Sequence, residues 1–341
     1  MRVIDSLYFL LWTIANLVIA RPKTVYVGTN PPMTVPFVVC IYARLFRAKY
    51  YFHVQDIHPE ATRVAVPLNR VAFTVLQWLD SITLRHATGI ITLSPGMKSY
   101  IRERSGTTAP IVLLDNPAVI NEDDFKQPRD SDVIFCGNAG RLQHIPLMID
   151  AIKEYLESGG SLRFTFAGGG VYSKDIQTLA NSYPSVTYLG RVSPDEAAKL
   201  LVRHRWGLMP ITDEVTRYAF PSKSSCYLVS GCKILAVCSE TTSVAEWVKE
   251  KGCGVVADPS VPSVVRKLKQ IEEETVALMG RQGSDSTRSD AVLASKDQVN
   301  SSLPAREILA FYSIEQHSDI LLDLVTKSRE LGVPALDQKS V

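Results

Sequence analysis

Short apolar runs alternate with amphipathic segments along most of the chain. In the first part, the runs predicted to be strands cover residues 23–28, 50–54, 89–93 and 111–114. The segments between them predict helices over residues 34–46, 66–86 and 95–103, because their apolar residues recur at helical spacing. Such alternation is typical of parallel sheets that are covered by helices on both faces.

A second alternating series follows residues 121–131, NEDDFKQPRDS, which have the composition of a linker. Its strands are predicted at residues 133–136, 162–167, 186–189, 206–209, 233–238 and 254–257. One helix between them, ending near His204, begins with Ser193, Pro194 and Glu196, which form a capping-box sequence. We therefore expect an α/β protein with two Rossmann-like domains that face each other across a cleft. The expected domains cover residues 1–120 and 130–303.

The most apolar stretch lies near the start, at residues 3–20. At ~100° per residue its polar members Asp5, Ser6, Thr13 and Asn16 fall within an arc of about 100°. Its uninterrupted apolar part is shorter than the roughly 20 residues that span a bilayer. The sequence leaves two alternatives for this helix, burial against the rest of its domain or a position in a membrane interface.

Charge is distributed unevenly over the 341 residues. Residues 1–105 contain 12 Lys and Arg against 5 Asp and Glu, a net charge of +7. The remainder contains 25 against 30, a net charge of −5. A basic first part favours an anionic surface or ligand, such as phospholipid headgroups or a lipid diphosphate. The alternative is a solvated basic face without a partner.

The six cysteines contain no C-x-x-C pair and several lie inside apolar runs, so they predict reduced core residues rather than a disulfide or zinc framework. We expect a cytosolic, reducing compartment and no bound metal.

The stretch DVIFCGNAGRLQHIP, residues 132–146, predicts a buried strand, a glycine-rich turn and a helix with proline in its first turn. Glycines let the backbone approach an anion, N–H groups at the start of the helix face it, and arginine adds charge. This turn is either a phosphate site or an ordinary connection between a strand and a helix.

Ligands of open parallel sheets bind beyond the carboxyl ends of the strands. Three further strand ends carry residues of the same kind: Gly168-Gly169-Gly170, Gly190-Arg191-Val192 and Pro221-Ser222-Lys223. Two helix starts that attract anions, together with two glycine turns, suggest a nucleoside diphosphate. The alternative for Lys223 is a solvated surface lysine.

The order of these motifs, GNAGR, FTFAGGG, VTYLGRVS, MPI and FPSKSSCYLVSGCKILAV, resembles the donor-binding domain of family 4 glycosyltransferases of the GT-B fold. The closest resemblance is to the bacterial fucosamine-transferase-like subgroup of O-antigen, capsule and exopolysaccharide assembly. In the first half, VYVGTNPP, YYFHVQDIHPE, LRHATGIITLSPGMKSYI and IVLLDNPA are similar to the acceptor domain of that subgroup. The resemblance covers nearly all of residues 1–325.

The resemblance implies a role for each matching position. Residues implied to contact the donor diphosphate are Gly137, Asn138, Gly140, Arg141, Ser222 and Lys223. Residues implied to lie at the nucleoside are Gly169, Gly170, Arg191, Val192 and the position of Cys226. Asp56 would orient or deprotonate an acceptor hydroxyl, and His58 is a weaker catalytic candidate. In both cases the alternative is a residue that only shapes the turn before Pro59.

The sequence departs from the family pattern in two places. Cys226 stands where many members have a glutamate that holds the ribose, so nucleoside binding would depend on other groups. The family also begins with a strand and a glycine-rich loop that precede the helix resembled by residues 3–20. We therefore expect an incomplete acceptor domain that lacks its first strand. Separately, residues 304–325 are expected to form a helix that packs back on this domain, and residues 326–341 are expected to form a tail.

Taken together, these features predict a retaining glycosyltransferase that moves an N-acetylated or deoxy hexose from a nucleotide sugar, with UDP as the expected nucleotide. The acceptor is expected to be a lipid-linked saccharide of cell-surface polysaccharide synthesis, reached at the cytoplasmic face of the cell membrane. No cofactor, metal or nucleic acid is expected. Two alternatives stay open, a nucleotide-sugar-binding remnant without turnover and a GT-B-fold sugar-nucleotide epimerase.

Overall fold

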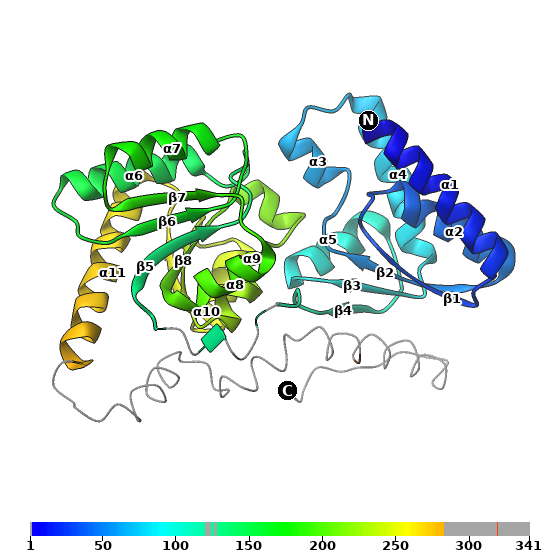
Figure 1. Cartoon of the computed structure of the whole chain (residues 1–341). Coiled ribbons are helices and arrows are strands. Elements are labelled where there is room, and N and C mark those ends of the chain that lie inside the picture. Colours follow the sequence, from blue (N-terminus) through cyan, green and yellow to red (C-terminus); the bar gives the residue numbers. More distant parts are fainter. Residues whose placement is uncertain (1, 119, 121–123, 126–127, 283–318, 320–341) are drawn as a thin grey trace. The chain divides into compact units, whose positions relative to one another are not determined.

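The chain was analysed as a computed structural model, which describes residues 2–118, 120, 124–125, 128–282 and 319 (Figure 1). It divides into two compact units. Unit 1 contains the described residues up to Asp115, Arg217–Phe220 and Asp319, and unit 2 contains the described residues of Asn116–Thr216 and Pro221–His317. Apart from Asp319, the expected helix 304–325 and the tail lie outside the described residues.

Unit 1 is built on a four-stranded parallel sheet in the order β1-β2-β3-β4. Its strands are β1 (Thr24–Gly28), β2 (Lys49–Val54), β3 (Gly89–Thr92) and β4 (Ile111–Leu113). Its helices are α1 (Arg2–Ala20), α2 (Thr34–Phe46), α3 (Glu60–Ala65), α4 (Arg70–His86) and α5 (Pro95–Ser105). The side chains of β2 and β3 are almost entirely buried, as expected for inner strands of a parallel sheet.

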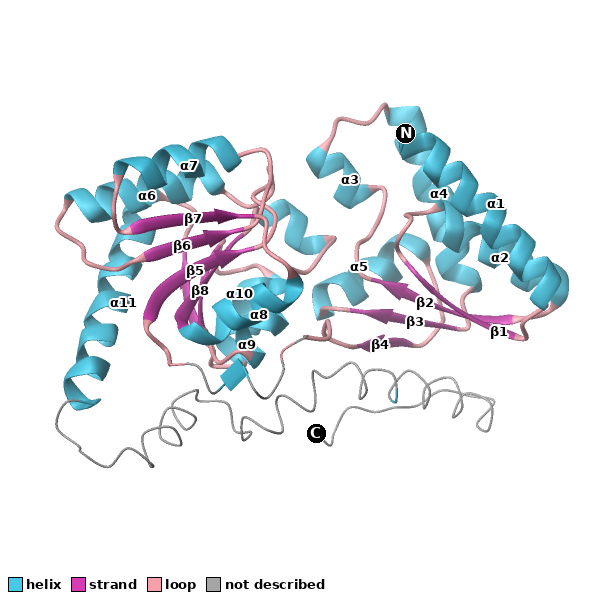
Figure 2. Cartoon of the chain, in the orientation of Figure 1, coloured by secondary structure: helices cyan, strands magenta, loops and turns pink. Residues whose placement is uncertain are grey.

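Unit 2 contains a six-stranded parallel sheet in the order β10-β9-β8-β5-β6-β7. Its strands are β5 (Ser131–Cys136), β6 (Phe164–Ala167), β7 (Val186–Gly190), β8 (His204–Pro210), β9 (Lys233–Val237) and β10 (Gly254–Ala257). The connecting helices are α6 (Ile145–Glu157), α7 (Ser173–Ser182), α8 (Pro194–Arg203), the 3-10 helix η2 (Asp213–Arg217), α9 (Lys223–Val229), α10 (Ser243–Glu250) and α11 (Val261–Gln282). Helices lie on both faces of this sheet (Figure 2). The expectation of an α/β fold with two parallel sheets is confirmed.

The core of unit 2 forms because large apolar side chains from neighbouring strands and helices interlock. Phe135 and Phe166 on adjacent strands have ring centroids 5.9 Å apart, and Tyr155 of α6 contacts Phe164 edge-on. The Tyr155 hydroxyl accepts hydrogen bonds from the N–H groups of Ser161 and Leu162, both at 3.1 Å. Its polar end is therefore satisfied in a buried position.

Three local expectations were wrong. Helix α3 was not predicted, because residues 55–60 looked like a turn. Helix α4 begins at Arg70 rather than at residue 66, since the side chain of Asn69 caps it by accepting from the N–H of Val71. His204 begins β8 instead of ending α8.

Helix α1 is mostly exposed over residues 8–20, where its side chains are described. Of the two alternatives for this helix, burial against the rest of its domain is therefore wrong for these residues. Within residues 8–20, only Leu17 is buried, and α1 packs against α2 along one side. Among the described helices, none combines the length and hydropathy that are needed to cross a bilayer.

Candidate functional site

The predicted glycine turn of unit 2 is joined to the turn after β6 by their backbones. The N–H of Gly137 donates to the carbonyl of Ala167 and the N–H of Ala139 to that of Gly169, both at 2.8 Å. A Cβ at Gly168 would lie 1.9 Å from the Gly137 oxygen, and one at Gly170 would lie 2.2 Å from the Ala139 oxygen. Only glycine permits this approach, so the glycines first serve to bring the two turns together.

This arrangement limits how many N–H groups the glycine turn can offer to an anion. The N–H of Gly137 is used between the turns, and that of Gly140 donates to the side-chain oxygen of Gln143 at 3.0 Å. The N–H groups of Asn138 and Arg141 make no hydrogen bond to the part of the chain that the structure describes. The backbone donors left for an anion are therefore fewer than the sequence suggested.

Lys223 is the most unusual cation of unit 2. Part of the residue is exposed, but its Nζ is buried and has no hydrogen-bond partner among the described residues. The ammonium lies 4.0 Å from the centroid of the Phe135 ring, and a Cβ at Gly137 would lie 3.6 Å from it. Burial lowers the pKa of Lys223 to about 8. The alternative of a solvated surface lysine is therefore wrong.

Cys226 lies one turn beyond Lys223 and influences the pKa of Cys136 at the end of β5. Burial raises the pKa of the Cys136 thiol, and the nearby Lys223 lowers it. The Tyr227 hydroxyl accepts from the N–H of Cys136 and donates to the carbonyl of Leu208, both at 3.1 Å. Tyr227, which the sequence analysis did not select, thus connects α9 to the end of β5 and to the middle of β8.

The other predicted diphosphate ligands lie at the surface. Asn138, Arg141 and Ser222 are exposed, and Arg141 forms no ion pair with any residue that the structure describes. Ser222 is the N-cap of α9, although its side chain makes no capping hydrogen bond. Asn138 and Arg141 follow β5, whereas Ser222 and Lys223 follow η2 and residues 218–220, which corrects their expected position directly after a strand. Within the described structure, none of the three exposed residues forms a hydrogen bond with Lys223.

The residues expected at the nucleoside are partly brought together. The side chain of Arg191 covers Gly169, because a Cβ there would lie 3.0 Å from Arg191 Nε. Val192 is half-buried at the start of the loop that leads to the capping box of Ser193 and Glu196. The N–H of Gly168 donates to the carbonyl of Gly190 at 2.6 Å, which links this loop to the preceding turn.

His144 is a further polar group of the glycine turn that the sequence analysis missed. It caps α6 in a left-handed conformation with φ 40°, which is uncommon for a residue other than glycine. Burial lowers its pKa, the charge of Asp213 opposes this, and its Nε2 has no hydrogen-bond partner among the described residues. The only signal in the sequence was its position directly before Ile145-Pro146.

In unit 1, Asp56 and His58 follow β2 and are half-buried. Burial raises the pKa of Asp56, which His58 partly opposes, and burial lowers the pKa of His58, which Asp56 and Glu60 partly oppose. The His58 Nδ1 is hydrogen bonded to Thr62 Oγ1 at 2.8 Å. The two predicted catalytic residues are therefore close enough to influence each other electrostatically.

A buried ionic network holds the loop that carries these residues. Arg104 pairs with Glu60 at 2.9 Å and with Asp80, and it also donates to the carbonyl of His58 at 3.0 Å. Glu60 additionally accepts from Tyr100 at 2.9 Å and from Gln77 at 2.8 Å. Burial raises the pKa of Asp80 to about 6. No local sequence pattern indicates this network, because its members are far apart in the chain.

Four residues of unit 1, Arg217–Phe220, come from the chain between two segments of unit 2. The N–H of Ile57 donates to the carbonyl of Tyr218 at 2.6 Å, and Asp56 forms an antiparallel bridge with Ala219. The Tyr218 ring lies edge-on to Tyr100 with centroids 5.1 Å apart. This segment, which we call the strap, supports the loop of Asp56 and runs directly into Pro221-Ser222-Lys223.

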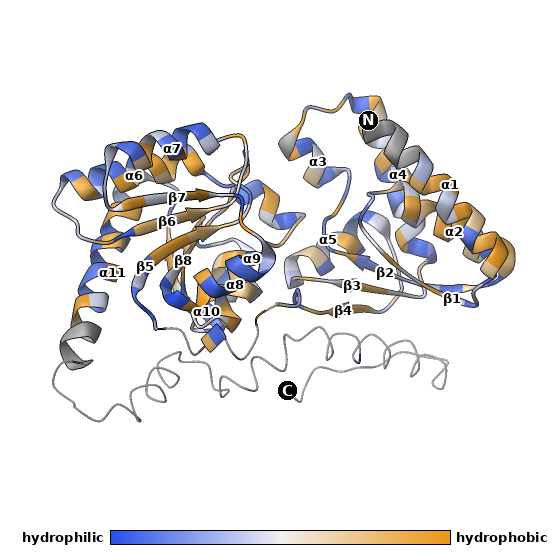
Figure 3. Cartoon of the chain, in the orientation of Figure 1, coloured by the Kyte–Doolittle hydropathy of each residue, from blue (hydrophilic) through white to orange (hydrophobic). Residues whose placement is uncertain are grey.

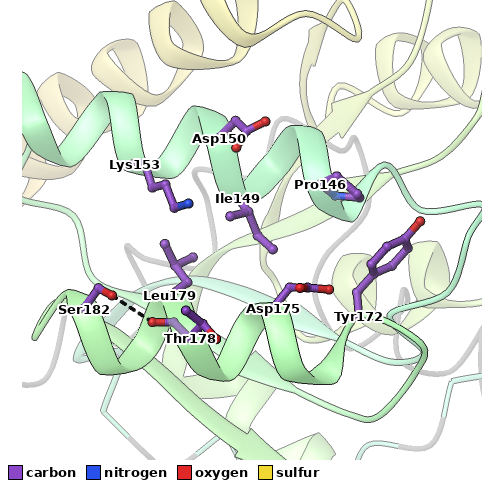
Figure 4. Close-up of a pocket in the computed structure, with 9 residues that line it drawn as sticks. All are labelled: Pro146, Ile149, Asp150, Lys153, Tyr172, Asp175, Thr178, Leu179 and Ser182. Carbon is purple, nitrogen blue, oxygen red and sulfur yellow. Dashed lines mark hydrogen bonds between the residues drawn. The ribbon is translucent and has the colours of Figure 1, made fainter.

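A separate groove of about 420 Å³ lies between α6 and α7 (Figure 4). It is lined by Pro146, Ile149, Asp150, Lys153, Tyr172, Asp175, Thr178, Leu179 and Ser182. None of these residues belongs to the predicted site.

Comparisons with protein-family models and with curated proteins give no match. Several solved structures are similar in fold. Sucrose-phosphate synthase from Thermosynechococcus elongatus superposes with a TM-score of 0.63 at 13% identity, over 94% of this chain and 78% of that one. Anabaena HepE, solved in complex with UDP, gives 0.58 at 13% identity, over 92% and 82%. A Listeria monocytogenes protein described as a UDP-N-acetylglucosamine 2-epimerase gives 0.59 at 11% identity, over 97% and 80%. The chain therefore has the GT-B fold.

Proposed function

We propose that this chain is a retaining glycosyltransferase that takes its sugar from a nucleotide diphosphate donor, with UDP as the nucleotide. The sugar is an N-acetylated or deoxy hexose, and the acceptor is a lipid-linked saccharide of cell-surface polysaccharide synthesis at the inner face of the cell membrane. The proposal combines the chemistry of the strand ends in unit 2 with the resemblance of the motifs.

One observation carries the proposal, namely the buried Nζ of Lys223, which has no hydrogen-bond partner among the described residues. A buried cation without a partner is costly, and an anion that reaches it would supply the missing interaction. Lys223 lies beside Gly137, at the carboxyl end of β5, where ligands of parallel sheets bind. In a transfer reaction, Lys223 and Arg141 would stabilise the negative charge of the departing nucleotide.

The fold supports the same function. HepE was solved with UDP, and another similar structure, the pneumococcal O-GlcNAc transferase GtfA, was solved with UDP and GlcNAc. For the acceptor side, we propose that Asp56 orients or deprotonates the acceptor hydroxyl. Its raised pKa suits a group that exchanges a proton.

The test is thermal unfolding of the full chain with UDP, GDP, ADP and inorganic phosphate. A nucleotide at about 100 times its Kd stabilises the native state by about 2.7 kcal/mol. We expect UDP to raise Tm by about 5–10 °C and a Lys223→Met variant to lose this shift. Equal shifts in wild type and variant would contradict the assignment of Lys223.

A second function is favoured by the similarity to the Listeria epimerase. Incubation with a UDP-sugar and no acceptor separates the two functions, because an epimerase inverts a sugar carbon without any acceptor. If nucleotide sugar binds and neither reaction occurs with a polyprenyl-diphosphate saccharide, the chain is a binding protein without turnover.

A further inference from the structure

Helix α1 turns its apolar side chains outward. Leu10, Thr13 and Leu17, which are spaced by three and four residues, are its less exposed positions and face the rest of unit 1. The remaining side is apolar, with Tyr8 71% and Trp12 52% exposed. Further large members of this side are Phe9, Leu11, Ile14, Val18 and Ile19. A helix on the surface of a globular protein normally shows the opposite pattern.

Two polar side chains of α1 form hydrogen bonds within the helix itself. The Thr13 hydroxyl donates to the carbonyl of Phe9 at 2.8 Å, and the Asn16 amide donates to that of Trp12 at 2.7 Å. Neither side chain therefore depends on water for these hydrogen bonds, which suits a helix that lies against hydrocarbon.

Two further helices of unit 1 also expose apolar side chains. Helix α2 packs against both α1 and α4. It exposes Ile41, Leu45 and Phe46, with Leu45 74% exposed. Helix α4 exposes Val71, Val75 and Trp78 at helical spacing. Figure 3 shows hydrophobic colour along α1 and α2. We call the exposed apolar residues of α1, α2 and α4 the apolar face of unit 1.

The exposed charges of residues 8–86 have one sign. Between residues 8 and 86, every Lys and Arg is exposed: Arg21, Lys23, Arg44, Arg47, Lys49, Arg63, Arg70 and Arg85. The acidic residues of the same range are Asp56, Glu60 and Asp80, of which the first is half-buried and the others are buried. The exposed ionic surface of this part is therefore entirely cationic.

We infer that the apolar face of unit 1 docks on an anionic phospholipid bilayer. The exposed Tyr, Trp, Leu and Ile side chains enter the headgroup and acyl boundary, while exposed Arg and Lys residues of the same part of unit 1 bind lipid phosphates. A second copy of this chain would bring the same excess of positive charge to the contact, so charge favours the bilayer. This inference deepens the proposed function, because it assigns the surface through which the protein would reach a lipid-linked acceptor. It rests on the proposed function, since only an enzyme with such an acceptor needs this surface.

The test is flotation of the full chain with phosphatidylcholine vesicles that contain about a quarter phosphatidylglycerol, compared with pure phosphatidylcholine. We expect binding to the anionic vesicles that weakens at high salt. Trp12→Ser with Leu45→Ser, and separately Arg44→Glu with Arg47→Glu, should each weaken binding by about tenfold or more. The matched controls, Val276→Ser and Arg266→Glu, change exposed residues of α11 and should bind like wild type.

Tryptophan fluorescence gives a second, local readout. The chain has four tryptophans; Trp12 and Trp78 of the apolar face are 52% and 58% exposed, whereas Trp206 and Trp247 of unit 2 are buried. Brominated lipids should therefore quench Trp12 and Trp78 and leave the emission of a Trp12→Phe, Trp78→Phe double variant unchanged.

Each contrary outcome would overturn the inference. These outcomes are the absence of vesicle binding, equal loss in the α11 controls, or self-association in solution that the Trp12→Ser, Leu45→Ser variant abolishes. The result is independent of donor binding: Lys223→Met should still float with vesicles, and the double serine variant should keep its stabilisation by UDP. Failure of one proposal is thus distinguishable from failure of the other.

Discussion

The ammonium group of Lys223 lies over the ring of Phe135, with 4.0 Å between Nζ and the ring centroid. The ring attracts the cation through its quadrupole but cannot replace the hydrogen bonds that water would supply. Lys223 is therefore held at the carboxyl end of β5 in a buried position that lowers its pKa to about 8. An incoming phosphate would change this balance, and the next three predictions concern this residue.

The first prediction concerns stability without ligand. The pKa of Lys223 falls from 10.5 to about 8 on folding, which corresponds to roughly 3 kcal/mol against the native state at neutral pH. Lys223→Met should therefore raise the free energy of unfolding by about 1–3 kcal/mol at pH 7, measured by urea denaturation. The exposed Lys174 of α7 provides the control, since Lys174→Met should change stability by less than about 0.5 kcal/mol.

The second prediction concerns pH. Between pH 8 and 10.5 the unfolded chain keeps the Lys223 proton that the native state has lost, so this residue makes stability rise with pH. Because other groups titrate in this range, the quantity to measure is the difference between wild type and Lys223→Met. The stability advantage of the variant should shrink as pH rises from 8 to 10.5.

Nucleotide binding should show the opposite pH dependence. Above pH 8 a diphosphate has to restore the proton of Lys223, so UDP affinity should fall by up to about tenfold per pH unit. Calorimetry in buffers of different ionisation enthalpy would detect uptake of up to about one proton at pH 9. Binding without proton uptake would show that Lys223 does not contact the ligand.

A substitution at Gly168 tests the close contact between the turn after β5 and the turn after β6. Gly168→Ala would place a Cβ 1.9 Å from the Gly137 oxygen, so the turns have to separate. We expect a loss of about 3 kcal/mol or more in stability, together with loss of UDP-induced stabilisation. Gly159→Ala is the matched control, because Gly159 also has a positive φ of 90° but no atom within 4 Å of the new Cβ. It should cost only about 1 kcal/mol.

Arg104 tests the network beneath the loop of Asp56. Arg104→Met would leave the buried Glu60 and Asp80 without their cation, at a cost of about 3–5 kcal/mol in stability. Arg104→Lys should restore only part of this, since a single ammonium group cannot reproduce the forked contacts of the guanidinium group. A change below about 1 kcal/mol in Arg104→Met would show that the network contributes little to the fold.

The fold could be predicted from the sequence because buried strands and amphipathic helices differ in the spacing of their apolar residues. The regular alternation of the two kinds of segment predicted both parallel sheets. Sequence reasoning also selected Lys223 and Gly168–Gly170 from their expected positions after strands. The burial of the Lys223 ammonium group could not be predicted from the sequence, because it depends on the ring of Phe135 and on the close approach of Gly137. For the same reason the sequence did not show that the N–H groups of Gly137 and Gly140 already donate hydrogen bonds within the chain.

The exposure of the apolar side of α1 could not be predicted from the sequence either. Its periodicity showed one polar and one apolar side, which is equally compatible with burial and with an interface. Only the position of Leu17 against the rest of unit 1 decided which side faces outward. The ionic network of Arg104 and the strap likewise arise from residues that are distant in the chain and carry no local pattern.

The strap has a consequence for how such proteins can be divided or recombined. Residues up to Asp115 do not form the whole of unit 1, because Ile57 bonds to Tyr218 and Tyr100 packs against its ring. A chimera that joins this part to the second half of a relative would inherit a foreign residue at position 218. A chimera joined after Asp115 therefore keeps its first half stable only if position 218, more than one hundred residues further along the chain, still fits against Ile57 and Tyr100.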